Sequence, residues 1–267
     1  MSKIQKLFKA LGLILRKPYL LNLVIESEDV MKDKVKAYGM GDGLPLVEID
    51  QLFGDFNGTA DPYAYLSGAT MPIDIALLRA LAQRYNVETY FEIGTWRGES
   101  VANMAKVVKH CTTLNLPKED IISLTHNELY ADLHCFFSKE LSNVEQLWGN
   151  SLTYDFADLY GKYDMVFVDG DHHYDSVKKD TETAFRLLRN DNSIIVWHDY
   201  ALDPETIRFD VMAAILDGTP ADKRKHIYHI SNTLCAVYLP EDLPTKKLTP
   251  YEEPQKYFKI DIQSIKC

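Results

Sequence analysis

The sequence predicts an α/β fold: a Rossmann-like, doubly wound and mostly parallel sheet, preceded by a helical N-terminal extension. From residue 72 onward, short apolar runs alternate with amphipathic helical patterns. Two of these runs, 165–168 and 194–197, end in carboxylates and imidazoles, at the strand ends where parallel sheets bind ligands. Two later runs, 226–230 and 235–239, are joined by a short turn, so we expect an antiparallel pair that closes the sheet.

The composition is that of an ordinary globular protein, since 46% of the 267 residues are hydrophobic and 25% are charged. The formal net charge of -10 argues against a nucleic-acid partner, because such a partner requires a basic surface. No C-x-x-C pair occurs, so we expect reduced thiols and a cytoplasmic location. The cysteines are Cys111, Cys135, Cys235 and Cys267.

Residues 1–60 are expected to form the N-terminal extension, and 2–15 to form an amphipathic helix. Its apolar face comprises Ile4, Leu7, Phe8, Leu11, Ile14 and Leu15, and Lys3, Lys6 and Lys9 lie on another face. One interpretation is a helix packed on its own domain or on a sister subunit in a homo-oligomer. The other is peripheral contact of residues 1–22 with an anionic inner-membrane surface. Arg16-Lys17-Pro18 interrupts the apolar stretch, which fits neither a signal peptide nor a spanning helix.

Turn-rich segments at 39–45 and 54–62 are expected to separate this extension from the α/β domain, 61–240. Pro72 is placed to begin a helix. The apolar patterns then predict strands at 87–91, 121–124, 144–148, 165–168 and 194–197, with helices over 101–108, 129–141 and 177–188. The tail, 241–267, contains several prolines and carries no predicted regular structure.

The first predicted strand of the domain leads into a glycine-bearing loop, Glu92-Ile93-Gly94-Thr95-Trp96-Arg97-Gly98-Glu99-Ser100. Gly94 permits a tight turn and close approach of a ligand to the backbone, and Gly98 lets the next helix start close to the sheet. The loop is not G-x-G-x-x-G and lacks a Lys-Ser/Thr ending, so it favours neither a dinucleotide site nor a P-loop.

With this loop the chain resembles the class I S-adenosylmethionine-dependent methyltransferases. The segments 163–172 and 194–200, which contain Asp-Gly-Asp-His and His-Asp, resemble a bacterial group that includes macrocin-type sugar O-methyltransferases. The resemblance covers roughly residues 70–240. It implies S-adenosylmethionine as cofactor.

The resemblance also implies roles for particular residues. Gly94 and Gly98 would line the methionine part of the cofactor, Glu92 would lie near its amino group, and Asn150 would contact the adenine. An acid is expected at the end of the second strand for the ribose hydroxyls, and Glu128 is the candidate. The full implied cofactor set is Glu92, Gly94, Thr95, Gly98, Ser100, Glu128, Asn150, Ser151 and Asp169.

In metal-dependent members of that group a divalent cation fixes the acceptor hydroxyl and lowers its pKa. The resemblance implies ligands at Asp169, His198 and Asp199, for Mg²⁺, Mn²⁺ or Fe²⁺. Asp171 is the candidate general base, with His172 or His173 as the alternative. A metal-free interpretation stays open, in which the Asp-His of the fourth strand caps the following helix and bonds the cofactor.

These observations predict an S-adenosylmethionine-dependent methyltransferase acting on a hydroxyl of a small molecule, a sugar or glycan precursor. One alternative is a metal-dependent hydrolase or hydroxylase on the same fold, which would leave the 92–98 loop without a role. The other is a non-catalytic binding protein with a methyltransferase-like fold.

Overall fold

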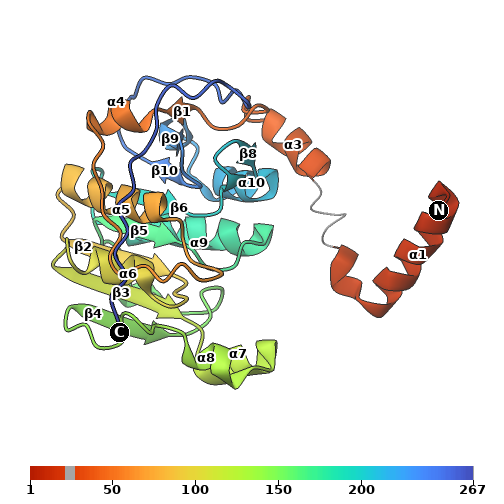
Figure 1. The fold of residues 1–267 in the computed structure, drawn as a ribbon, viewed down its shortest axis with the longest axis horizontal. Coiled ribbons are helices and arrows are strands. Elements are labelled where there is room, and N and C mark those ends of the chain that lie inside the picture. The colour runs from red at the N-terminus through yellow and green to blue at the C-terminus, as the bar shows by residue number, and fades with distance from the viewer. Residues whose placement is uncertain (22–27, 267) are drawn as a thin grey trace.

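The computed structural model describes residues 1–21 and 28–266, in which one large sheet forms the centre of the molecule (Figure 1). The strands are β1 (Leu46–Val47), β2 (Thr89–Ile93), β3 (His110–Asn115), β4 (Val144–Trp148), β5 (Met165–Val168), β6 (Ile194–Trp197), β7 (Ala201–Asp203), β8 (Thr206–Ile207), β9 (Ile227–Ile230) and β10 (Ala236–Tyr238).

The strand order of the main sheet is β1-β9-β10-β6-β5-β2-β3-β4. Strands β2 to β6 are parallel to their neighbours in this group, whereas β10 pairs antiparallel with both β6 and β9. The predicted Rossmann-like sheet with an antiparallel closing pair is therefore confirmed. β7 and β8 form a separate two-stranded ribbon.

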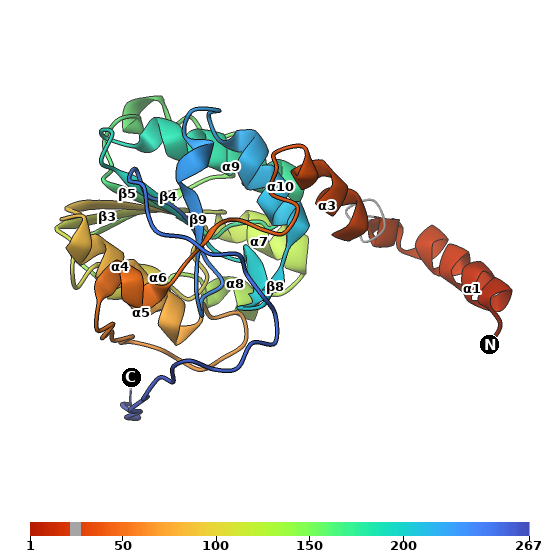
Figure 2. The same ribbon diagram turned by 90° about the horizontal axis from the view of Figure 1, so that it is seen from above.

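Helices cover both faces of the sheet. The α-helices are α1 (Lys3–Arg16), α3 (Glu28–Lys36), α4 (Ile49–Phe53), α5 (Pro72–Arg84), α6 (Glu99–Met104), α7 (Lys118–Thr125), α8 (Glu128–Asp132), α9 (Tyr174–Leu187) and α10 (Phe209–Gly218). Short 3₁₀ turns are η1 (Pro18–Leu21), η2 (Ala157–Leu159) and η3 (Arg224–His226). Figure 2 shows α4, α5 and α6 on one face and α9 and α10 on the other.

Two hydrophobic cores result, one on each face, because successive strand residues point to opposite sides. In β2, Phe91 and Ile93 belong to the core under α9 and α10, whereas Tyr90 belongs to the core under α5 and α6. All three side chains are almost fully buried. Burial on both faces explains why the inner strands are nearly continuous apolar runs.

The direction of winding reverses between β2 and β5, which are adjacent in the sheet although β3 and β4 come between them in sequence. Such a reversal leaves a crevice outside the carboxyl ends of the two strands. Gly94 follows β2 and Asp169 follows β5, so the reversal brings the glycine loop and the first acidic strand end together.

One predicted strand was wrong. Residues 121–124 lie in helix α7, and the second strand of the domain is β3. Pro117 precedes α7, and Glu119 and Asp120 lie in its first turn, where acidic side chains favour helix formation. The predicted helix 129–141 is also shorter than expected, since α8 ends at Asp132.

The segments outside the core domain differ in how they contact it. β1 lies within the range assigned to the extension, yet it pairs with β9 at the edge of the sheet. The tail returns to the same edge, where the backbones of Leu46 and Lys246 exchange two hydrogen bonds of 2.9 Å. Helix α3 packs on α10, with Lys34 Nζ 2.8 Å from Asp217 Oδ2. Segments before residue 61 and after residue 240 therefore contact the sheet edge and α10.

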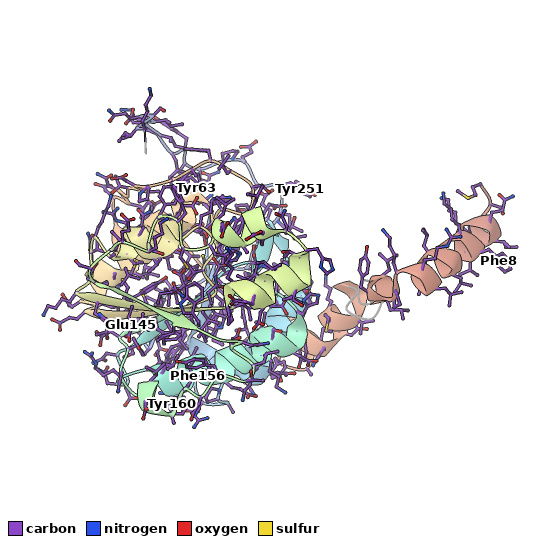
Figure 3. All side chains as sticks on the ribbon, turned by 90° about the horizontal axis from the view of Figure 1, so that it is seen from below. Phe8, Tyr63, Glu145, Phe156, Tyr160 and Tyr251 are labelled. Carbon is purple, nitrogen blue, oxygen red and sulfur yellow. The ribbon has the colours of Figure 1, made fainter. Side chains whose placement is uncertain are left out.

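Helix α1 was predicted over 2–15 and is present, but it lies away from the sheet in Figures 1 and 2. Phe8 marks this separation in Figure 3. In the described part of the chain, each helix is too short or too polar to cross a membrane.

Cys111, Cys135 and Cys235 are buried free thiols, and Cys267 lies outside the described residues.

Candidate functional site

A cavity of about 720 Å³ opens at the carboxyl ends of β2, β3, β4, β5 and β6. Its lining includes Gly94 and Thr95 after β2, Asn115 at the end of β3, and Gly149-Asn150-Ser151 after β4. At its other end lie Asp169 to His172, His198 and Asp199. Its size is within the range that binds a cofactor together with a small molecule.

The glycine loop is folded tightly against the neighbouring strand end. Gly94 has φ +88°, and a Cβ atom there would lie 2.3 Å from the carbonyl oxygen of Asp169. Its backbone N–H donates to the carbonyl of Leu114 at 2.9 Å. Gly98 has φ +82° at the start of α6, where a Cβ atom would crowd Ser138. Only glycine suits Gly94, since both the dihedral and the space exclude a side chain.

Glu92 and Ser100 lie behind this loop and do not line the cavity. The Glu92 carboxylate is fully buried and accepts hydrogen bonds from Tyr90 (2.6 Å), Thr95 (2.9 Å) and Ser100 (3.0 Å). Burial raises the pKa of Glu92 to about 7, although these donors act in the opposite direction. Glu92 therefore supports the loop from within, whereas Thr95 supports it and also lines the cavity.

The strand-end position expected to hold an acid is occupied by Asn115, because β3 and not 121–124 is the second strand. Its Nδ2 donates to the carbonyl of Thr95 at 2.9 Å, which leaves Oδ1 to accept from a ligand hydroxyl. Glu128 is exposed at the start of α8, 3.7 Å from Lys118, and does not line the cavity. Residues 121–124 belong to helix α7 and not to a strand, so Glu128 does not follow a strand end.

Three rings that the sequence did not single out lie beside Asn115. Trp96 stacks on Tyr130 with ring centroids 4.2 Å apart, and His134 meets Trp96 edge-on at 4.5 Å. All three line the cavity. Within the described residues, His134 Nε2 is buried without a hydrogen-bond partner, and burial lowers the pKa of this imidazole. An aromatic wall with a polar atom fits a planar heterocyclic ligand.

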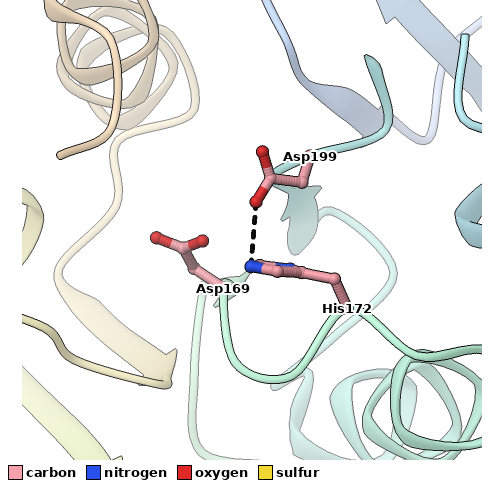
Figure 4. A group of neighbouring side chains, drawn as sticks. All are labelled: Asp169, His172 and Asp199. Carbon is pink, nitrogen blue, oxygen red and sulfur yellow. Dashed lines mark ion pairs between the residues drawn. The ribbon is translucent and has the colours of Figure 1, made fainter. Parts of the chain in front are cut away.

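At the opposite end of the cavity, Asp169, His172 and Asp199 converge (Figure 4). Each offers one ligand atom, and these atoms lie within 4.8 Å of one another. His172 Nε2 is 3.0 Å from Asp199 Oδ2. Asp199 has φ +53°, a left-handed conformation that Asp tolerates better than most residues. Burial raises the pKa of Asp199, but bonds to His172 and His198 outweigh it, so the pKa is lowered.

His198 is placed differently from the ligand role that the sequence predicted. Its Nε2 lies 3.2 Å from Oδ2 of Asp74, a fully buried residue of α5. Its Nδ1 lies 3.1 Å from Asp169 Oδ1 without the geometry of a hydrogen bond. Burial lowers the pKa of His198, but the carboxylates of Asp169, Asp199 and Asp74 together raise it well above its usual value. The structure thus groups Asp169 and Asp199 with His172, and His198 lies behind them.

Asp171 lies at the cavity wall but already has partners. Its Oδ1 is 2.5 Å from His173 Nδ1, and its Oδ2 accepts from Ser176 at 2.7 Å. Burial raises the pKa of Asp171, whereas the bonds to His173 and Ser176 lower it below its usual value. These contacts fix the loop before α9.

The donor set fits a divalent cation. Two carboxylates and an imidazole from Asp169, Asp199 and His172 suit Mg²⁺, Mn²⁺ or Fe²⁺, and the separations allow all three to reach one ion. The predicted ligands Asp169 and Asp199 thus lie together, and the imidazole grouped with them is that of His172.

Comparison with known proteins identifies the class. Residues 91–200 match the family described as "Methyltransferase domain". This range runs from β2 through Asp199 and contains most of the cavity wall. Residues 91–200 are therefore similar to methyltransferase domains, and this similarity supports S-adenosylmethionine-dependent methyl transfer as the activity. This assignment disfavours the hydrolase, hydroxylase and non-catalytic alternatives.

Several solved structures are similar to the chain. An O-methyltransferase from Bacillus cereus in complex with SAH is 14% identical, with 84% of this chain and 97% of that chain covered and a TM-score of 0.46. The O-methyltransferase TomG from Streptomyces achromogenes, involved in tomaymycin synthesis and solved with SAM, is 18% identical, with 65% and 82% covered and a TM-score of 0.42. No curated protein matches the chain by sequence.

Proposed function

We propose that this enzyme methylates a hydroxyl oxygen of a small molecule, a sugar or glycan precursor, with the help of a divalent cation held by Asp169, His172 and Asp199. The observation that carries the proposal is the arrangement of the cavity. The glycine loop and aromatic wall lie at one end, and the acid and imidazole cluster lies at the other. A cofactor and a metal-bound acceptor could therefore meet in one cavity.

The cofactor end is assigned from the residues that line it. Gly94 and Thr95 would approach the methionine part, where the bent backbone leaves room. Asn115 would accept from a ribose hydroxyl through Oδ1, in place of the acid that the resemblance implies. Asn150, Tyr130 and Trp96 would surround the adenine. When bound, S-adenosylmethionine supplies a sulfonium methyl group that needs little activation from the protein.

At the acceptor end, the chain has to hold one hydroxyl oxygen in line with that methyl group and accept its proton. A bound cation would lower the pKa of the hydroxyl. Asp169 is positioned by Thr70, whose Oγ1 donates to Oδ2 at 3.3 Å, and by His198 behind it. His198 is in turn held by Asp74. These contacts limit the movement of Asp169 and so support alignment.

A metal-free variant of the same function is favoured by one observation. His172 Nε2 lies 3.0 Å from Asp199 Oδ2, and a neutral imidazole held by a carboxylate can accept the proton of an acceptor hydroxyl by itself. Asp171 is the less favourable base, because both of its oxygens are engaged by His173 and Ser176.

The test is calorimetric titration of chelator-treated protein with S-adenosylmethionine, with and without Mn²⁺ or Mg²⁺. We expect binding in the micromolar range that does not require metal. Asp199→Asn should weaken Mn²⁺ binding at least tenfold and leave cofactor binding unchanged, because it removes one ligand of the cluster. The matched control is Asp203→Asn, an exposed carboxylate outside the cavity.

The outcomes separate the alternatives. Metal binding without cofactor binding would contradict the methyltransferase assignment and favour a hydrolase or hydroxylase. Cofactor binding without any metal binding would contradict the cation and leave the His172–Asp199 pair as the proton acceptor.

A further inference from the structure

The apolar face of α1 is uncovered. In the described ranges, no residue of this helix is buried, and its large apolar side chains are exposed to water except for Ile14, which is partly exposed. The relative exposures are 67% for Ile4, 58% for Leu7, 70% for Phe8 and 84% for Leu15. The described residues of α1 are therefore not packed on their own domain, which leaves a sister subunit or a membrane surface from the two sequence interpretations. A contiguous exposed apolar face of this kind usually marks an interaction surface.

The helix itself is well specified by its sequence. Ser2 caps the N-terminus, since its Oγ accepts from the backbone N–H of Gln5 at 3.2 Å and its own N–H donates to Gln5 Oε1 at 2.8 Å. Such a capping box defines where a helix begins. Helical spacing then puts Ile4, Leu7, Phe8, Leu11 and Leu15 on one side. Leu13 lies on the opposite side, among the basic residues.

Charge is segregated between this segment and the remainder of the protein. Of the 29 Lys and Arg residues, five lie in residues 1–21, and none of the 39 Asp and Glu residues does. The five are Lys3, Lys6, Lys9, Arg16 and Lys17. The rest of the chain is strongly acidic, so an anionic surface would repel it and attract only this segment.

We propose that α1 docks on the surface of a membrane that contains anionic phospholipids, with its apolar face inserted among the lipids. An amphipathic helix with a basic polar face lies in the plane of the interface, and its apolar side sinks about 5–10 Å into the boundary of the acyl chains. Tyr19 of η1 is 62% exposed and continues the amphipathic surface beyond α1. Charge complementarity supports the lipid partner, because an anionic surface attracts the basic segment and repels the acidic remainder of the chain, which confines contact to residues 1–21.

Docking would hold the active-site edge of the domain near the lipid. Six residues, 22–27, separate the described segments, and a chain of that length spans at most about 20 Å. Helix α3, which follows, packs on α10 and places Lys34 beside Tyr174, the first residue of α9. Helix α9 begins at the carboxyl end of β5, the edge that carries the cavity.

The test is co-sedimentation of the full chain with vesicles of phosphatidylcholine alone or mixed with phosphatidylglycerol. We expect partitioning onto the mixed vesicles that declines as salt is added. Leu11→Gln should weaken this partitioning about tenfold, because it removes an apolar side chain from the inserted face. The matched control is Leu13→Gln, since Leu13 is similarly exposed (44% against 47% for Leu11) but lies on the opposite face.

The cofactor titration and thermal melting serve as folding controls, and both should be unchanged in the two variants because α1 contributes no buried residue. No partitioning onto mixed vesicles at low salt would overturn the proposal. Equal weakening by Leu11→Gln and Leu13→Gln would overturn insertion of the apolar face. Concentration-dependent self-association that Leu11→Gln abolishes, with no vesicle binding, would also overturn it and assign α1 to a second copy of the chain.

Discussion

At the scale of single residues, the buried carboxyl of Glu92 shows how the glycine loop is stabilised. The side chain is fully buried and meets three hydroxyl donors, with no basic residue among them. Hydroxyl donors stabilise the anion less than a cation would, so desolvation prevails and the pKa rises to about 7. The loop that carries Gly94 and Thr95 is therefore hydrogen-bonded to a carboxyl group that is mainly protonated below about pH 7.

This gives a prediction about pH. The folded-state pKa of Glu92, about 7, is above its ordinary value of 4.5. Its contribution to stability is therefore fully present below pH 4.5 and is lost as pH rises through about 7. The loss should total about 3 kcal/mol at most, at 1.36 kcal/mol for each unit of pKa shift.

Glu92→Gln should flatten this decline. Urea unfolding at about pH 5 and about pH 8 would measure it as a smaller difference between the two free energies of unfolding. Burial also raises the pKa of Asp180 to about 7, so part of the decline should persist in the variant. An unchanged difference between the two pH values would show that Glu92 does not titrate as described.

Gly94 provides a second prediction. In Gly94→Ala the new Cβ would meet backbone atoms, the Asp169 carbonyl oxygen at 2.3 Å and Gly170 Cα at 2.5 Å, which have no freedom to rotate away. We expect a loss of more than about 2 kcal/mol of stability and at least tenfold weaker binding of S-adenosylmethionine, measured by urea unfolding and calorimetry.

Gly161→Ala is the matched control, because Gly161 also has positive φ (+70°) but nothing lies within 4 Å of its Cβ position. Gly161→Ala should lower the free energy of unfolding by only about 1 kcal/mol, because of backbone strain at positive φ, and should leave the affinity for the cofactor unchanged. If the two variants behave alike, dihedral strain alone explains Gly94 and the close approach to Asp169 is irrelevant.

Sequence reasoning located the acidic strand ends but not the contacts between them. Asp169 and Asp199 follow apolar runs, and that pattern sufficed to predict that they lie together. Asp74 carried no such signal, since it occupies the first turn of a helix 124 residues before His198 in the chain. Its importance arises only when α5 packs on the sheet, and that contact determines that His198 faces Asp74 while His172 joins the cluster.

At the scale of elements, the segment before α5 acts as a strap at the mouth of the cavity. Ser67 to Thr70 line the cavity, and Arg97 of the glycine loop holds them. Its guanidinium is nearly buried and donates to the carbonyls of Ser67 (3.0 Å) and Leu66 (3.1 Å). Because Arg97 and Gly94 belong to one loop, the strap is joined directly to the glycine loop that lines the cavity.

Arg97→Gln should loosen the strap. Two partly buried carbonyls lose their donor, so we expect stability to fall by about 2 kcal/mol and amide hydrogen exchange at 63–70 to accelerate at least tenfold. Lys106→Gln is the control, since Lys106 also contacts this segment through Asp61 (2.7 Å) but is half exposed, and exchange should change little. Equal acceleration in both variants would mean that Arg97 has no special role.

The sequence did not predict β3, because its polar side chains form hydrogen bonds with residues that are distant in the sequence. β3 contains Thr112 and Thr113, both fully buried, and their hydroxyls bond with Tyr163 and Thr95. β3 therefore lacks the run of apolar residues that predicts a strand. Ile121 and Ile122 of α7 form part of such a run and led to the wrong prediction. Register and strand order then follow from these long-range contacts, which a pattern of local hydrophobicity does not contain.

At the scale of the whole molecule, β1 and the C-terminal tail attach to the same edge of the sheet. β1 pairs with β9, and Lys246 and Lys256 of the tail contact Glu48 just after β1, at 2.9 and 2.6 Å. Lys256 also lies 2.9 Å from Asp50. The tail had no predicted regular structure, and apart from its bridge to Leu46 it is held mainly by side chains. An edge strand that is covered in this way is protected from pairing with other chains.

Lys256→Gln should therefore release the tail. Burial raises the pKa of Glu48, but bonds to Lys256 and Lys246 lower it to about 2. The ionised Glu48 thus contributes to the stability of the folded protein above pH 4.5, and this contribution is lost as the pH falls toward 2. We expect the variant to lose about 1 kcal/mol near neutral pH, less at lower pH, and to be cleaved faster by protease within 244–266.

Lys259→Gln is the matched control, because Lys259 pairs with Asp261 at 3.3 Å while both side chains are more than 80% exposed. Exposed pairs contribute little, so this variant should match the parent in stability and cleavage. If Lys256→Gln also matches the parent, the two backbone hydrogen bonds between Leu46 and Lys246 suffice to hold the tail, and the protection of β1 depends on that bridge alone.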